Sequence, residues 1–211
     1  MSYVVKEIFY TLQGEGSRSG RPAVFCRFTG CNLWTGREAN RLSAICQFCD
    51  TDFVGTNGTE GGIYKTALDL VDVIDRCWPD NFEDPKYVVC TGGEPLLQVD
   101  SELINALHER GFEIAVETNG TQTPPEGIDW ICVSPKAGAE LKLTHGNEIK
   151  VVVPQLGINL NYLRSLDFEY FYLQPMENKN LDENIKFAIA YCLENPVWNL
   201  SLQIHKMIGI R

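Results

Sequence analysis

The chain has 211 residues, which is enough for one domain with a full hydrophobic core. Its composition, 44% apolar and 22% charged, is that of an ordinary globular protein, and its formal net charge of −10 argues against a nucleic-acid backbone as a partner. Since no apolar run approaches the length of about 20 residues that a transmembrane helix needs, we expect no contact with the membrane interior.

The N-terminal segment combines a mixed apolar and polar stretch, residues 3–10, with the sequence TLQGEG at residues 11–16. Glycines let a backbone approach a ligand closely. Gln13 and Glu15 then present hydrogen-bonding groups to that ligand. A tight solvent-exposed turn explains the same pattern equally well.

Residues 23–30 follow as a predicted strand with a single charge, Arg27. Charged side chains are rarely buried without a partner, so Arg27 is expected to be paired or directed into a cavity. An arginine at a strand end suits the binding of a carboxylate group. The alternative is an edge-strand arginine that points to water.

Three cysteines, Cys31, Cys46 and Cys49, lie on one long loop after this strand. Two residues separate the last pair, a spacing that lets both thiolates face one metal centre, and a fourteen-residue insert has to fold Cys31 back toward them. A 4Fe–4S cluster held by three cysteines keeps one iron open to a small molecule. A structural zinc site needs four protein ligands, and the fourth would then be distant in sequence: Cys26, Cys90 or His108.

Of the eight cysteines, five lie in apolar surroundings and are expected to be buried free thiols: Cys26, Cys77, Cys90, Cys132 and Cys192. The first residues carry one lysine and no long apolar stretch, so we expect no secretory signal. Together these features predict a cytosolic protein with reduced thiols.

After the cysteines, residues 50–52 (Asp-Thr-Asp) offer hard oxygen ligands that suit magnesium. A turn or helix-capping triplet is the alternative interpretation. Residues 55–62 form a glycine-rich loop without periodicity. Apolar residues then recur at helical spacing over residues 67–78, with Thr66 as the N-cap.

From residue 87 onward, short apolar strands alternate with helices or short connections. We expect helices over residues 99–110 and 181–193. The strands are expected over residues 87–90, 112–116, 130–133, 148–153, 170–173 and 200–204. This alternation predicts an α/β fold whose mainly parallel sheet is covered by helices. With about six strands and three helices, the sheet is expected to form a partial, open (β/α) barrel.

Each predicted strand ends in a polar or glycine-rich cluster. In parallel sheets the ligand site lies beyond the carboxyl ends of the strands. One edge of the sheet should therefore gather Arg27, Glu94, Glu117, Ser134, Lys136, Gln174 and His205.

The motif GGEP at residues 92–95 ends one of these strands, downstream of the three-cysteine loop. The combination resembles the radical S-adenosylmethionine enzymes. Further stretches resemble one group within this family: TLQGEG, CDT after the last cysteine, ETNG, VSPK, LQPM and SLQIHK. The first cysteine gap departs from the usual spacing of three and then two, although some members of the group share the longer gap. The last three residues, 209–211, also depart from the proline-ended tail of close relatives.

The resemblance implies a single domain over residues 1–211 that binds a 4Fe–4S cluster and S-adenosylmethionine. It implies a lyase that removes a hydrogen atom from C6 of 6-carboxy-5,6,7,8-tetrahydropterin. Ring contraction and loss of ammonia then give 7-carboxy-7-deazaguanine, which enters queuosine and related 7-deazapurine biosynthesis. Magnesium, a homodimer and an electron donor such as flavodoxin are implied as well.

Residue roles follow from the same resemblance. Cys31, Cys46 and Cys49 hold the cluster, and Thr51 binds magnesium through its hydroxyl group. The candidates for S-adenosylmethionine binding are Phe48, Gly92, Gly93, Glu94, Glu117, Ser134, Lys136 and Gln174. The candidates for substrate binding are Leu12, Gln13, Gly14, Glu15, Arg27, Thr91 and His205. A structural histidine at His205 and an ion-pair partner at Glu117 are the simpler alternatives.

Two other functions share part of this pattern. An enzyme that activates glycyl radicals on another protein would share the cysteines and GGEP, but it needs no pterin pocket. A non-catalytic zinc-binding adaptor would explain the cysteines alone. Incubation with the tetrahydropterin distinguishes the lyase from the activating enzyme, because only the lyase forms a deazapurine. Metal analysis of anaerobically purified protein distinguishes the lyase from the zinc-binding adaptor.

Overall fold

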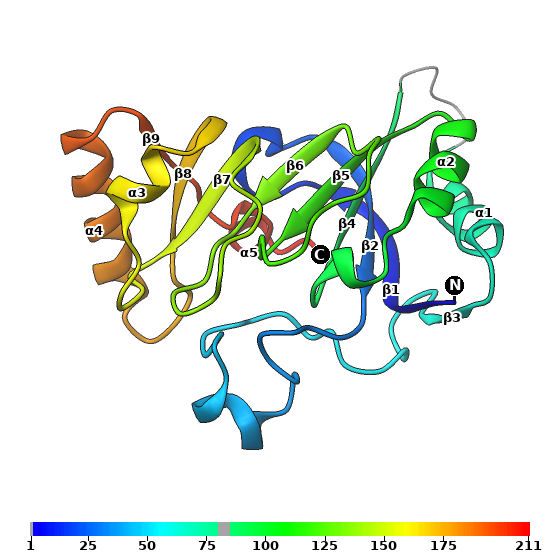
Figure 1. Cartoon of the computed structure of the whole chain (residues 1–211), viewed down its shortest axis with the longest axis horizontal. Coiled ribbons are helices and arrows are strands. Elements are labelled where there is room, and N and C mark those ends of the chain that lie inside the picture. Colours follow the sequence, from blue (N-terminus) through cyan, green and yellow to red (C-terminus); the bar gives the residue numbers. More distant parts are fainter. Residues whose placement is uncertain (1, 80–84) are drawn as a thin grey trace.

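The computed structural model describes residues 2–79 and 85–211. Within them, nine strands form one sheet in the order β3-β1-β2-β4-β5-β6-β7-β8-β9 (Figure 1). Their bounds are β1 Tyr3–Leu12, β2 Pro22–Phe28, β3 Gly62–Tyr64, β4 Lys86–Gly92, β5 Phe112–Thr118, β6 Trp130–Val133, β7 His145–Val153, β8 Asp167–Pro175 and β9 Trp198–Leu200.

Neighbouring strands from β2 through β4 to β9 are parallel, whereas β1 is antiparallel to both β2 and β3. The edge strands β3 and β9 do not pair with each other, so the sheet is curved but open. The prediction of a mainly parallel, open α/β sheet is confirmed. The expected number of strands was too low, because β1, β3 and β9 lie outside the predicted set.

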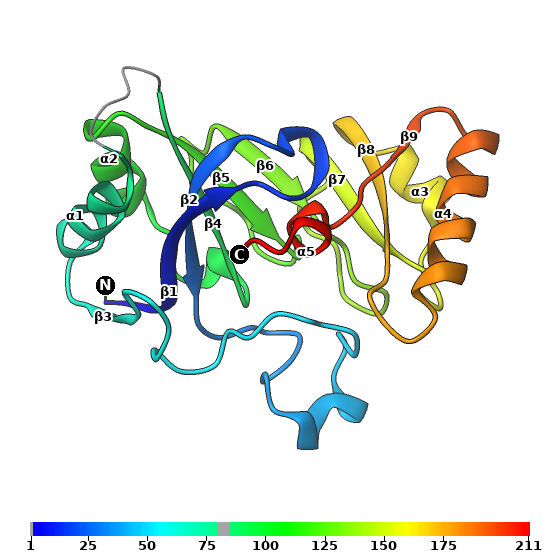
Figure 2. The same ribbon diagram turned by 180° about the vertical axis from the view of Figure 1, so that it is seen from behind.

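Five helices accompany the sheet in the described residues: α1 Ala67–Cys77, α2 Ser101–Glu109, α3 Leu160–Arg164, α4 Leu181–Glu194 and α5 Ile204–Ile208. Figures 1 and 2 show α1 and α2 at one end of the sheet and α3 and α4 at the other. The first pair packs on β1 and β5, and α4 packs on β8 and β9. No helix in the described part of the chain has the length and apolar character needed to cross a membrane.

The predicted helices begin where their capping residues indicate. Thr66 caps α1 through a hydrogen bond from the Asp69 backbone N–H, and the Asp69 carboxylate accepts from the Thr66 N–H in return. Asp100 accepts a hydrogen bond of 3.0 Å from Leu103 N–H, so α2 begins two residues later than expected. The helix predicted over 181–193 is α4, which ends one residue later.

The strand predicted over residues 200–204 is wrong. β9 ends at Leu200, and His205 lies in the short helix α5 rather than at a strand end. Beyond β9 the chain bonds to the glycine loop as well as to β8, where Ser201 N–H donates to Leu173 O at 2.9 Å. Ser201 Oγ accepts from Gly16 N–H at 3.0 Å, and Ile204 N–H donates to Gly14 O at 2.9 Å.

Strand alternation gives the sheet two chemically different faces. On β7, Ile149, Val151 and Val153 pack into the core beneath α4, so Glu148 and Lys150 point to the opposite face. On β5, Ile114 and Val116 face the helices, and Glu117 takes the opposite side. The face of the sheet opposite α1 to α4 therefore carries polar side chains, although many of them are buried.

We predict that Leu70→Ala in α1 lowers the free energy of unfolding by about 2–5 kcal/mol, because it removes a fully buried side chain between helix and sheet. The neighbouring Leu68 is 56% exposed, so Leu68→Ala should change stability by no more than about 0.5 kcal/mol. Chemical denaturation of both variants measures this. Equal losses would contradict the packing of α1.

Candidate active site

A cavity of about 370 Å³ opens on the polar face, at the carboxyl ends of the parallel strands. Its wall contains every predicted site residue except Glu94. These residues are Leu12, Gln13, Gly14, Glu15, Arg27, Cys31, Cys46, Phe48, Cys49, Thr51, Thr91, Gly92, Gly93, Glu117, Ser134, Lys136, Gln174 and His205. Of the residues predicted to gather at one edge of the sheet, Glu94 does not line this cavity; the others do, namely Arg27, Glu117, Ser134, Lys136, Gln174 and His205.

The three cysteines line the same cavity, and the insert between them folds as a small unit below the sheet (Figure 1). Trp34 packs edge-on against Phe53, with ring centroids 5.6 Å apart. The Arg41 guanidinium stacks 4.0 Å from the Trp34 ring and donates to the carbonyl oxygens of Gln47 and Cys49, each at 3.1 Å. These contacts fold the loop back, so that the segment with Cys46 and Cys49 packs against the segment that follows Cys31.

Local contacts set the protonation of the thiols. Burial raises the pKa of Cys31, although the backbone N–H of Leu33 donates to its sulfur at 3.4 Å. A hydrogen bond from Cys46 lowers the pKa of Cys49 to about 6, and the same bond raises the pKa of Cys46. The contact between the two thiols therefore favours the thiolate form of Cys49.

The distant zinc ligands considered from the sequence lie elsewhere. Cys26 on β2 and Cys90 on β4 are register partners within the main core. His108 in α2 bonds to Asp129 at 3.0 Å. Among the described residues, the only cavity-lining cysteine or histidine beyond the three loop thiols is His205, which packs against Gly14.

The two glycines of GGEP bring β4 against the start of the cysteine loop. A Cβ on Gly92, whose φ is +117°, would lie 2.2 Å from Phe28 O, and one on Gly93 would lie 1.9 Å from Gly30 O. Glu94 N–H donates to Gly30 O at 2.8 Å, which fixes the same approach. Any side chain at these positions would push β4 away from Cys31.

Glu94 is fully buried and does not line the cavity. Its carboxylate accepts hydrogen bonds from Thr118 Oγ1 at 2.7 Å, Asn119 N–H at 2.8 Å and Leu96 N–H at 3.0 Å. Burial raises its pKa, while these donors favour the charged form. The structure therefore places the side chain between β4 and β5, where it holds Asn119 close to the cysteine loop through Asn32.

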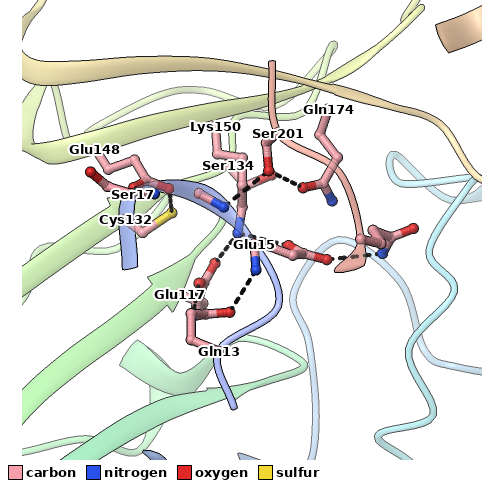
Figure 3. Close-up of polar contacts among 12 residues, drawn as sticks. Gln13, Glu15, Ser17, Glu117, Cys132, Ser134, Glu148, Lys150, Gln174 and Ser201 are labelled. Atoms are coloured by element: carbon pink, nitrogen blue, oxygen red, sulfur yellow. Dashed lines mark hydrogen bonds and ion pairs between the residues drawn. The ribbon is translucent and has the colours of Figure 1, made fainter. Parts of the chain in front are cut away.

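A network of ion pairs and hydrogen bonds joins charged and polar residues of the cavity wall (Figure 3). Lys150 Nζ lies 2.7 Å from Glu15 Oε2 and 2.9 Å from Glu117 Oε2. Gln13 Nε2 donates to Glu117 Oε1 at 3.1 Å, and Gln203 Nε2 donates to Glu15 Oε1 at 2.9 Å. Lys150 was not among the residues singled out from the sequence. Arg27 was, because a charged residue in an apolar strand needs a partner, and the same reasoning applies to Lys150, which shares its predicted strand with Glu148.

Ser134, Lys136 and Gln174 lie on the same wall. Lys136 Nζ donates to the Ser134 backbone oxygen at 2.6 Å and to its hydroxyl at 2.7 Å, and it stands 5.9 Å from the Phe48 ring. Burial lowers the pKa of Lys136. Gln174 also lines the cavity, and its Oε1 accepts a hydrogen bond from Ser201 Oγ at 2.9 Å (Figure 3).

Arg27 reaches the cavity from β2 but is already paired. Its Nε donates to Glu7 Oε1 at 2.9 Å, and the other oxygen of Glu7 accepts from Arg211. Arg211 stacks 4.6 Å from the Phe9 ring and also borders the cavity. Two guanidinium groups thus share one carboxylate at this wall, which leaves it locally basic.

Thr51 lines the cavity between two aspartates that bind lysines. Asp50 pairs with Lys206 at 2.6 Å, and Asp52 pairs with Lys6 at 2.8 Å. Asp52 also accepts from the backbone N–H of Val54, as the turn interpretation of this triplet predicts. Among the described residues, no hydrogen bond or ion pair engages the Thr51 side chain, whereas both aspartates are paired.

Comparison with known proteins places the chain in a class. The model of the Radical SAM superfamily matches residues 40–210. The chain therefore belongs to the radical SAM superfamily, whose members bind a 4Fe–4S cluster and S-adenosylmethionine.

Within this class, the chain is 60% identical to the 7-carboxy-7-deazaguanine synthase of Bradyrhizobium diazoefficiens and 59% identical to that of Burkholderia multivorans, with complete coverage of both chains in each case. The crystal structure of QueE from Escherichia coli superposes with a TM-score of 0.73 at 28% identity, covering 97% of this chain and 95% of that one. The chain belongs to the family of 7-carboxy-7-deazaguanine synthases.

The residues present fit the two groups that the superfamily implies. Three thiols from one loop line a single cavity. Because Gly93 has no side chain, its backbone lies directly beside Cys31. Three cysteines suit a cluster that keeps one iron for another ligand. Cys31, Cys46 and Cys49 would hold the cluster, next to the wall formed by the ends of β4, β5, β6 and β8.

We predict that Cys31→Ala, Cys46→Ala and Cys49→Ala each abolish cluster assembly, because the loop supplies no spare thiolate. Anaerobic reconstitution followed by iron and sulfide analysis measures this. Cys77→Ala, a change in α1, is the matched control and should keep full iron content. A native protein that takes up one zinc ion and no iron would contradict the assignment.

Proposed function

We propose that this chain converts 6-carboxy-5,6,7,8-tetrahydropterin to 7-carboxy-7-deazaguanine with loss of ammonia, as a lyase of queuosine and related 7-deazapurine biosynthesis. One observation carries the proposal: a single cavity joins the three-thiol loop to a wall rich in charged hydrogen-bonding groups. Full-length identity of 52–60% to five relatives named 7-carboxy-7-deazaguanine synthase supports it.

When bound, the cluster and S-adenosylmethionine supply hydrogen-atom abstraction at C6 of the pterin. The chain's own residues bind, orient and shield the reactants. We propose that Glu117 accepts hydrogen bonds from ribose hydroxyls, since an ionised carboxylate only accepts. The remaining contacts to S-adenosylmethionine are proposed for Phe48, Gly92, Gly93, Ser134, Lys136 and Gln174. Glu94 is proposed to support this wall indirectly, by accepting the hydrogen bond from Asn119 N–H.

The substrate carboxylate is proposed to bind Arg27. The shared pairing of Arg27 and Arg211 with Glu7 supports this, because one carboxylate does not neutralise two guanidinium groups. Gln13 and Glu15 face the pterin, as do the cavity-lining residues Leu12, Gly14, Thr91 and His205. Burial lowers the pKa of His205, so this imidazole is neutral at physiological pH and can accept or donate one hydrogen bond.

Three finer features belong to the same proposal. Magnesium is proposed to bind the Thr51 hydroxyl together with substrate oxygens and water. A one-electron donor such as flavodoxin is proposed to reduce the cluster, and two copies of the chain are proposed to form a homodimer. A reducing cytosolic location suits the eight free cysteines.

The alternatives explain less. An enzyme that activates glycyl radicals acts on a protein and has no use for the charged wall of Glu15, Arg27 and Glu117. A zinc adaptor has no use for a cavity beside its metal site. The identity over the whole length of the synthases also disfavours both.

The test is an anaerobic incubation of reconstituted protein with the tetrahydropterin, S-adenosylmethionine, magnesium and a chemical reductant. We expect formation of the deazapurine with release of one ammonia per product, measured by mass spectrometry. Cys31→Ala protein is the matched control and should form none. If S-adenosylmethionine is cleaved but no deazapurine appears, the proposed substrate is wrong.

We also predict that Thr51→Ala raises the magnesium concentration needed for half-maximal turnover by about tenfold, since it removes one oxygen ligand, and leaves iron content unchanged. Thr123→Ala, a change at an exposed position, is the control. Magnesium titration of initial rates measures the shift. An unaltered magnesium dependence would remove Thr51 from the site.

A further inference from the structure

Lys150 is the most deeply buried ammonium group in the cavity wall. Its side chain is 3% exposed, and it projects from β7 between two carboxylates (Figure 3). Glu15 comes from the loop after β1, and Glu117 comes from the end of β5. Both ion pairs are shorter than 3 Å and both carboxylates are at most 20% exposed, so solvent screens them little.

The charge balance around Lys150 favours this bridge. Burial raises the pKa of Glu15, but the charge and hydrogen bond of Lys150, together with the hydrogen bond from Gln203 and the charge of His205, hold that pKa well below its usual value. Burial lowers the pKa of Lys150, but Cys132, Glu117, Glu15 and Glu148 together raise it above its usual value. Glu148, two residues earlier on the same face of β7, is different: burial raises its pKa. One ammonium thus faces two carboxylates, Glu15 and Glu117.

The glycines on either side of Glu15 leave it no room to move. A Cβ on Gly14 would lie 2.3 Å from His205 Nδ1, and a Cβ on Gly16 would lie 2.0 Å from Glu148 Oε1. The loop is therefore in van der Waals contact with α5 on one side and with β7 on the other. Within this packed loop, Lys150 holds one oxygen of the Glu15 carboxylate and Gln203 holds the other.

We propose that Lys150 is a positioning residue that holds Glu15 and Glu117 on one ammonium group, and so fixes the substrate relative to S-adenosylmethionine. The inference rests on the proposed function, in which Glu15 faces the pterin and Glu117 faces the ribose. Hydrogen-atom abstraction requires the two reactants at a fixed separation. Lys150 fixes this separation without contacting the pterin or S-adenosylmethionine.

Removal of the ammonium has a defined consequence. Without Lys150, the Glu15 and Glu117 carboxylates face each other in a poorly solvated wall, so the pKa of one of them rises. Among the described residues, His205 of α5 is the other charged group that acts on Glu15, and Cys132 of β6 and Glu148 of β7 face Lys150. None of them is bonded to Glu15, so none replaces the lost ammonium.

The experiment measures binding rather than turnover. Isothermal titration of the reconstituted holoenzyme with the tetrahydropterin, in the presence of S-adenosylmethionine, is carried out between about pH 6 and pH 8. Lys150→Met should weaken pterin binding by roughly 10- to 100-fold, and the loss should grow as pH falls because the carboxylate becomes protonated. Lys150→Arg should restore the flat pH profile of the native protein. Lys186→Met, a change at an exposed lysine of α4, should bind normally.

A double variant separates positioning from a general structural role. If Lys150 acts through Glu15, Lys150→Met should cause no more than about a twofold further loss of pterin affinity in a Glu15→Gln background. Full additive losses, or a Lys150→Met protein with native affinity and a flat pH profile, would overturn the proposal.

Failure of the proposed substrate is distinguishable from failure of the proposal about Lys150. If native protein does not bind the pterin, the same cycle is run with S-adenosylmethionine alone. Lys150→Met should then weaken S-adenosylmethionine binding through Glu117, and a Glu117→Gln background should remove the effect. Unchanged S-adenosylmethionine affinity in Lys150→Met protein would reject the role of Lys150 in that case.

Discussion

The structure depends on compensation of charge on the inner face of an open sheet. Strand alternation turns Glu117, Glu148 and Lys150 to the side opposite α1 to α4, and the cysteine loop and α5 then cover much of that side. Buried charges are tolerated only where they are paired and hydrogen-bonded. Lys150 meets this requirement for two carboxylates from different segments, and the cavity forms around the groups so fixed.

Close backbone approach is the second constraint, and it explains two motifs in the same terms. Gly92 and Gly93 let β4 touch the start of the cysteine loop, and Gly14 and Gly16 let the loop after β1 touch His205 and Glu148. In each case the nearest neighbour of the glycine is protein. The motifs therefore act first on the framework, by setting thiols and carboxylates at fixed positions around the cavity. Ligand contacts are a consequence of that framework.

Most of the sheet could be predicted because its signals are local. Continuous apolar runs identified β4 to β8, and capping residues such as Thr66 located the helices. The prediction failed where tertiary bonding outweighed local pattern. β3 is a three-residue strand that forms by pairing with β1, and the segment after β9 bonds to the glycine loop, so it ends as helix α5.

The sequence by itself determined the chemistry: three thiolates on one loop, the GGEP turn, and the polar residues that follow successive strands. Only the tertiary structure decided how those groups are held. The stacking of Arg41 on Trp34, the internal position of Glu94 and the bridge from Lys150 to Glu15 all join residues whose contact requires the folded chain. Residue type and spacing report what a side chain can do, whereas its partner and burial depend on segments far away in sequence.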